Sequence, residues 1–148
     1  NRVASLFRRR NFNIDSLTVG RTEDPNVSRM TIVLDSNVAR VDQVQKNLYK
    51  LVNVIQVDEV THQPFVSRDL ALIKVRASAE AAWIASQFGA RIIDHRDDRM
   101  ILDLSDEEAR VEQFIEALRP HGILELVRTG VVAMGQGSHT VQVAPQFA

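Results

Sequence analysis

The order of predicted helices and strands repeats once along the chain, and this repeat limits the possible folds more than any other feature. In the second half, alternating apolar residues predict strands and helical spacing predicts helices. The predicted segments are a strand at 70–77, a helix at 78–88, the strands RIIDHR and MILDLS, a helix at 105–122 and a last strand, ILELVRTGVV. The resulting order is strand, helix, strand, strand, helix, strand.

The first half shows the same order without an opening strand. Its predicted segments are a helix at 2–10, strands at 13–19 and 29–35, a helix from 41 to about 53, and a strand at 54–60. Asp24-Pro25-Asn26 predicts the turn between the two strands. Equivalent segments lie about seventy residues apart, which indicates two copies of one unit. The sequence therefore predicts an α+β protein with two tandem ferredoxin-like (βαββαβ) domains.

The first copy is expected to lack its first strand in this chain, and we expect an N-terminal piece to precede residue 1. The boundary between the copies is expected near Pro64, where a proline interrupts the strand pattern. We assign residues 1–62 to an N-terminal domain, 63–66 to a linker, 67–137 to a C-terminal domain and 138–148 to a C-terminal tail.

Local signals mark several element ends in the second half. Gly89 follows the first predicted helix, and Asp97-Asp98 lie at the predicted hairpin turn. Ser105 and Glu108 have the spacing of a capping box, and Gly122 follows the end of the second helix. The apolar stripe of that helix is Val111, Phe114, Ile115 and Leu118.

Composition excludes several classes of function. The chain has no cysteine, which rules out disulfides, zinc thiolates and thiol catalysis. Lys and Arg number 18 against 19 Asp and Glu, a balance that argues against a general nucleic-acid binder. The apolar runs are too short to span a bilayer, and no signal-like segment opens the chain. We therefore expect a cytoplasmic protein without a membrane or nucleic-acid partner.

Groups that could carry out catalysis are scarce in the sequence. The four histidines are scattered and none has HxH or HExxH spacing. The segment DHRDDR, 94–99, has the residue types of a metal site, but a solvated hairpin tip explains it better. The glycines of GQGSH lack the strand-turn-helix context of a phosphate loop. The sequence does not indicate an enzyme.

Arg8, Arg9 and Arg10 form a basic stripe with Arg2 on the first predicted helix. Such a run is usually a solvated face. Docking onto an acidic partner is the alternative, and the sequence leaves both interpretations open.

The opening stretch NRVASLFRRRNFNIDSLTVGRTEDPNVSRMTIV resembles the small, regulatory subunit family of acetolactate synthase (acetohydroxyacid synthase). The family pattern RV-x-x-LF-x-x-R-x-[FY]-NI-[ED]-SL-T-V, followed by T-x-DP-x-x-SRMTI, is highly specific. The matching residues are Arg2, Val3, Leu6, Phe7, Arg10, Phe12, Asn13, Ile14, Asp15, Ser16, Leu17, Thr18, Val19, Thr22, Asp24, Pro25 and Ser28 to Ile32. LYKLVNVIQV, RDLALIKVRA and RTGVVAMGQG also look like the family, so the resemblance covers residues 1 to about 137.

The resemblance implies an ACT-type N-terminal domain and a related ferredoxin-like C-terminal domain in a non-catalytic protein. It implies that the chain binds and activates a large, thiamine-diphosphate-dependent catalytic subunit and confers feedback inhibition by a branched-chain amino acid, typically valine. No cofactor is expected on this subunit, whereas thiamine diphosphate, Mg and FAD are expected on the catalytic partner. In the family a strand and an E-N-x-x-G-x-L loop precede the first helix, and this chain starts just after them.

The resemblance also implies an effector site between two paired N-terminal domains of a homodimer. By matching position, we assign effector binding to Asn1, Arg2, Val3, Asn13 and Ile14. A helix N-terminus offers N–H groups to a carboxylate, an asparagine amide can both donate and accept, and Ile14 and Leu17 could form an apolar wall. Asn11 is interpreted as a left-handed C-cap. For Asn13, a role in shaping the turn alone stays open.

Two other classes of protein compete with this interpretation. The first is a free-standing amino-acid-sensing ACT protein without an enzyme partner, which would purify alone. The second is a small enzyme on a ferredoxin-like scaffold, which the scarcity of nucleophiles and metal ligands disfavours. The fold by itself does not separate these, because this scaffold hosts many functions.

Overall fold

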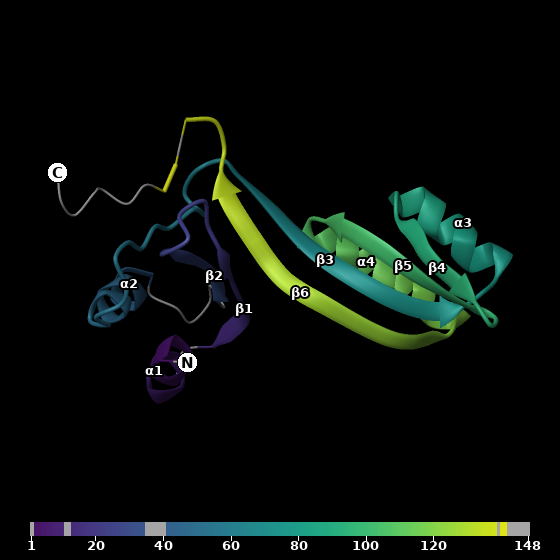
Figure 1. Cartoon of the computed structure of the whole chain (residues 1–148), viewed down its shortest axis with the longest axis horizontal. Coiled ribbons are helices and arrows are strands. Elements are labelled where there is room, and N and C mark those ends of the chain that lie inside the picture. Colours follow the sequence, from purple (N-terminus) through teal and green to yellow (C-terminus); the bar gives the residue numbers. More distant parts are fainter. Residues whose placement is uncertain (1, 11–12, 35–40, 139, 142–148) are drawn as a thin grey trace. The chain divides into compact units, whose positions relative to one another are not determined.

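The computed structural model describes residues 2–10, 13–34, 41–138 and 140–141. Its helices and strands, shown in Figure 1, confirm the predicted α+β class. They are α1 (Arg2–Arg9), β1 (Ile14–Arg21), β2 (Ser28–Leu34), α2 (Val41–Tyr49), β3 (Phe65–Arg76), α3 (Ala79–Phe88), β4 (Arg91–Arg96), β5 (Arg99–Asp106), α4 (Glu108–Leu118), the short 3₁₀ helix η1 (Arg119–His121) and β6 (Ile123–Gly135).

The chain divides into two compact units. The first consists of Asn1–Val66 with Ala133–Ala148, and the second is Ser67–Val132. The assignment of 1–62, 63–66, 67–137 and 138–148 to separate parts stays a prediction. No helix in the described residues is long and apolar enough to cross a membrane.

The second unit is a four-stranded sheet in the order β4-β5-β3-β6, with both helices on one face (Figure 1). Alternate residues of β3 and β5 point to that face, as the period of two in a strand requires. The predicted stripe of α4 covers them, and Ala81 and Ala85 of α3 complete the core. The core residues are Ala71, Ile73, Val75, Ala81, Ala85, Met100, Leu102, Leu104, Val111, Phe114, Ile115 and Leu118. This confirms the βαββαβ order predicted for the second half.

The ends of α3 and the β4–β5 hairpin follow the local signals. Ser78 caps α3, because its Oγ accepts a hydrogen bond from the Ala81 N–H at 3.0 Å. Gly89 ends the helix with a left-handed φ of 73°. Asp97 and Asp98 have φ values of 53° and 65°, as a type I′ hairpin turn requires. The predictions for Gly89 and for the turn at Asp97-Asp98 are confirmed, whereas Ser78 caps the helix instead of lying in it as predicted.

The predicted capping box at the start of α4 is wrong. Ser105 lies in β5, where its backbone is paired with Leu70 of β3, so the residue belongs to the strand and not to the start of the helix. The helix starts at Glu108 and its N-cap, Glu107, makes no side-chain cap hydrogen bond. The Glu107 N–H donates instead to Oδ1 of Asp106 at 2.8 Å. Strand pairing therefore outweighs the local capping pattern at this joint.

Asp69 is the most deeply buried charged residue among those described, with 2% of its surface exposed. Its carboxylate accepts a hydrogen bond from Nε of Arg128 at 2.9 Å and one from the Gly130 N–H at 3.2 Å. Arg128 also pairs with Glu112 of α4. Burial alone would lower the pKa of Arg128, but the hydrogen bonds to Glu112 and Asp69 raise it above its ordinary value. The ion pair therefore ties β3, β6 and α4 together.

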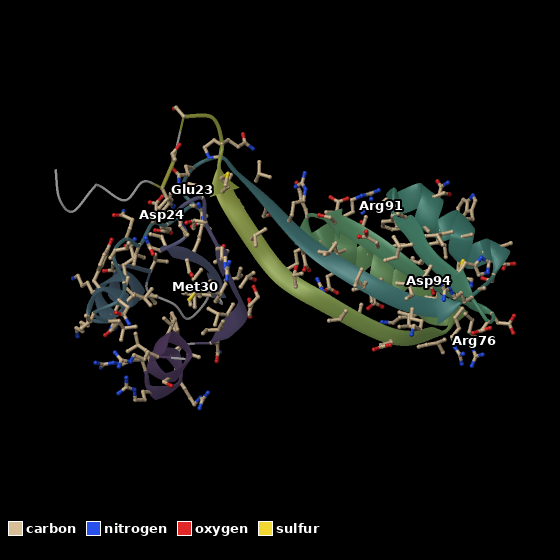
Figure 2. The ribbon with its side chains drawn as sticks, viewed as in Figure 1. Glu23, Asp24, Met30, Arg76, Arg91 and Asp94 are labelled. Atoms are coloured by element: carbon tan, nitrogen blue, oxygen red, sulfur yellow. The ribbon has the colours of Figure 1, made fainter. Side chains whose placement is uncertain are left out.

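The first unit contains the antiparallel β1–β2 hairpin, with α1 and α2 packed against it. Leu6, Phe7, Val44 and Leu48 form its buried core. The turn between the strands is the predicted one, since Oδ1 of Asp24 accepts a hydrogen bond from the Asn26 N–H at 2.9 Å. Figure 2 shows Asp24 beside Glu23 at this turn.

Two predictions for the first unit are wrong. Helix α2 ends at Tyr49 rather than near Asn53, and 54–60 is not a strand. Val54 and Val57 still pack against the core, but the Val57 N–H donates to the Tyr49 hydroxyl at 2.8 Å instead of to a strand. In the second unit the last strand, β6, pairs with the opening strand, β3. The described part of the first unit has no equivalent of β3, so 54–60 has no ladder to join.

Candidate functional site

Helix α1 brings two of the assigned residues to the edge of the first core. Val3 is half-buried and packs against the cluster that contains Leu6 and Phe7, which follow it at helical spacing. Arg2, the first residue of α1, is exposed. Asn1 and Asn11, also singled out in the sequence, lie outside the described residues.

The start of β1 supplies the other two residues. Ile14 opens the strand, lies opposite Leu34 of β2 and packs against the same cluster as Val3. Asn13 precedes it and is exposed, and its side-chain amide has no hydrogen-bond partner among the described residues. The hydrophobic core thus joins Val3 and Ile14, while the polar side chains of Arg2 and Asn13 remain in solvent.

A β-bulge follows the start of β1 directly. The register shifts between Ile14 and Ser16, which leaves Asp15 as the extra residue in the ladder. Leu17, proposed from the sequence as part of an apolar wall, is half-buried and lies opposite Ile32 of β2. Bulges of this kind are common beside binding sites, where they redirect side chains.

Ser16 is a candidate that reasoning from the sequence missed. Its Oγ is buried and has no hydrogen-bond partner in the described structure. A buried polar atom without a partner is uncommon and calls for an explanation, such as a hydrogen bond to a bound ligand. No sequence signal marks it, because the burial arises where the bulge shifts the register of two strands.

These groups have the chemistry to hold a small zwitterion. The first turn of α1 has N–H groups without intrahelical partners, and it carries no acidic side chain that would neutralise the positive end of the helix dipole. A carboxylate suits that end of a helix. The amide of Asn13 can accept from an ammonium or donate to a carboxylate, and Val3 and Ile14 are apolar.

The structure offers no comparable arrangement for metal chemistry. The residues it describes contain no group of three or more His, Asp or Glu side chains that could hold a metal ion. In the segment DHRDDR, the Asp94 carboxylate pairs with Nε of Arg96 at 3.3 Å. Figure 2 marks Asp94 on the exposed hairpin of the second unit.

Two protein-family models match the chain, one for each half. The model described as "AHAS small subunit-like ACT domain" matches residues 1–56. The model described as "Small subunit of acetolactate synthase" matches residues 68–137. Together they cover most of the chain.

Individual relatives agree with the family models over nearly the whole length. The chain is 47% identical over 141 residues to a probable acetolactate synthase small subunit of Archaeoglobus fulgidus, covering 93% of this chain and 88% of that protein. It is 42% identical over 140 residues to the acetolactate synthase small subunit of Mycobacterium leprae, covering 92% of this chain and 83% of that protein. Among solved structures, it matches the acetolactate synthase small subunit of Thermotoga maritima with a TM-score of 0.83 and 36% identity, covering 93% of this chain and 89% of that one.

Proposed function

The chain belongs to the acetolactate synthase small-subunit family, and from this membership we propose that it binds and activates a thiamine-diphosphate-dependent catalytic subunit. We further propose that it confers feedback inhibition by valine or another branched-chain amino acid on that partner. The family, and the ACT-type fold of the first domain, confirm the resemblance drawn from the motifs of the sequence. Members of the family are regulatory small subunits.

The proposed effector site comprises Asn1, Arg2, Val3, Asn13 and Ile14. The half-buried Val3 and Ile14, which share one core cluster, support an apolar subsite for the effector side chain. The exposed amide of Asn13 and the first turn of α1 support polar subsites for its charged groups. We add Ser16, because a ligand group would satisfy its buried Oγ.

A homodimer with paired N-terminal sheets is part of the proposal. The described sheet of the first unit has only two strands, and an unpaired strand edge favours pairing with another chain. Light scattering of the full-length protein at micromolar concentration should give the mass of a dimer. A monomer at all concentrations that saturate the catalytic subunit would contradict a shared effector site.

The proposal places the protein in the cytoplasm with the catalytic subunit. Thiamine diphosphate, Mg and FAD belong to that partner, and no cofactor is assigned to the chain itself. The effector would then bind to the small subunit and not to the thiamine-diphosphate-dependent active site of the catalytic subunit.

Membership of the small-subunit family carries this proposal, and reconstitution of the two subunits tests it. The full-length chain is mixed with the catalytic subunit of the same organism, and acetolactate formation is measured with each protein alone and with both. We expect no activity from the small subunit alone and a higher turnover of the mixture than of the catalytic subunit. A free-standing amino-acid sensor would neither co-purify with the catalytic subunit nor change its turnover.

A further inference from the structure

The exposed face of α1 consists of arginine with a single serine. Arg2, Ser5 and Arg9 follow one another at helical spacing and are exposed, as is Arg8. On the opposite side of the helix, Leu6 and Phe7 are only 7% and 1% exposed. We call Arg2, Arg8 and Arg9 the arginine face.

The arginine face has no acidic residue on its own helix and no ion-pair partner in the part of the chain that the structure describes. Helix α1 contains no acidic residue, and the positions one turn before Arg8 and Arg9 are Ala4, Ser5 and Leu6. None of the three arginines forms an ion pair in the described part of the chain. The arginines that do so are Arg91, Arg96, Arg110, Arg119 and Arg128.

Helix stability explains only part of this arrangement. Cations in the last turn of a helix interact favourably with its dipole, which accounts for Arg8 and Arg9. Arg2 lies in the first turn, where the same dipole disfavours a cation. An external anionic surface would satisfy all three.

The chemistry of the arginine face indicates that its anionic partner is the surface of a protein. A membrane-surface helix inserts its apolar side into lipid, but the apolar side of α1 is buried in its own unit. Nucleic-acid binding draws on a large basic excess, whereas this chain has a formal net charge of −1. A local cluster of cations on a balanced protein is typical of a surface that steers one protein onto another.

We propose that the arginine face docks onto an acidic patch of the catalytic subunit and speeds the association of the two proteins. This inference rests on the proposed function, which supplies the partner. Arginine suits the role, since its planar guanidinium pairs with carboxylates through two parallel hydrogen bonds. Arg8 and Arg9 of the arginine face therefore act in recognition of the partner and not in binding of the effector.

The test compares two pairs of substitutions in the full-length chain. Arg8→Gln with Arg9→Gln removes two charges of the face, keeps good helix formers and leaves Arg2 of the proposed effector site intact. Arg68→Gln with Arg99→Gln removes two exposed arginines of the second unit that form no ion pair in the described structure. The association rate with the catalytic subunit is measured between about 20 and 500 mM NaCl, and circular dichroism verifies the fold.

At the lowest salt concentration, Arg8→Gln/Arg9→Gln should slow association by about ten-fold, while the control pair changes it by less than about two-fold. The wild-type rate should fall steeply with salt, and the rate of the α1 variant should depend on salt much less. Equal rates and equal salt dependence for wild type and the α1 variant would overturn the inference.

Two further outcomes distinguish failure of the docking inference from failure of the proposed function. If wild-type protein does not bind the catalytic subunit at any salt concentration, the proposed function itself fails. If the α1 variant binds the catalytic subunit normally but loses binding of duplex DNA or phosphatidylserine vesicles that the wild type shows, the face serves another partner and the inference is refuted.

Discussion

Replacement of Asn13 by alanine distinguishes two roles of its side chain, which are contact with the effector and shaping of the turn before β1. Asn13 is exposed and its amide has no partner among the described residues, so Asn13→Ala should change the free energy of unfolding by less than about 0.5 kcal/mol. A hydrogen bond to a charged group of the effector contributes about 1.5–3 kcal/mol. The valine concentration for half-inhibition should therefore rise by about ten-fold to one-hundred-fold.

The assay uses one preparation of the variant for three measurements. These are its melting temperature, its activation of the catalytic subunit, and inhibition of the mixture by valine. Asn26→Ala is the matched control, because Asn26 is an exposed asparagine at the other end of the same hairpin. Unchanged valine inhibition of Asn13→Ala would refute the ligand contact. A lower melting temperature with parallel loss of activation and inhibition would show that Asn13 only shapes the turn.

Three further substitutions and one control substitution test the second unit by urea denaturation, followed through Trp83, the one tryptophan of the chain. Arg128→Ala should cost about 3–5 kcal/mol, because it leaves Asp69 charged and 2% exposed; a cost below about 1 kcal/mol would contradict a buried ion pair. Phe114→Ala should cost about 3–5 kcal/mol, since Phe114 is 0% exposed and packs on Phe88 with ring centroids 5.1 Å apart. The control for Phe114→Ala is Val127→Ala, which should change stability little because Val127 is 58% exposed. Asp98→Gly should raise stability by about 0.5–1 kcal/mol, because φ is 65° there; a loss of stability would mean that the aspartate side chain supports the turn.

Features set by neighbouring residues could be predicted from the sequence. Gly89 ends α3 because a glycine tolerates its left-handed φ, and the hairpin turn forms where two aspartates meet. The buried stripe of α4 follows from helical spacing alone. In the candidate site, Arg2, Val3, Asn13 and Ile14 lie at the helix start and strand start where the pattern placed them.

Features set by distant partners could not be predicted in the same way. The segment 54–60 alternates like a strand, but a strand also needs a ladder, and none is available to it in the described structure. Ser105 has a capping-box spacing but is taken into β5 by its pairing with Leu70. Asp69 is buried in β3, and the group that neutralises its charge, Arg128, lies 59 residues away in the sequence. The unpartnered Ser16 Oγ depends likewise on the register of two strands.

Inhibition by valine that depends on this chain tests the central claim most directly. Acetolactate formation by the catalytic subunit is titrated with valine in the absence and in the presence of a saturating amount of the full-length small subunit. The account predicts that valine inhibits the mixture at concentrations that leave the catalytic subunit alone unaffected. Equal sensitivity to valine, and to leucine and isoleucine, with and without the small subunit would contradict it.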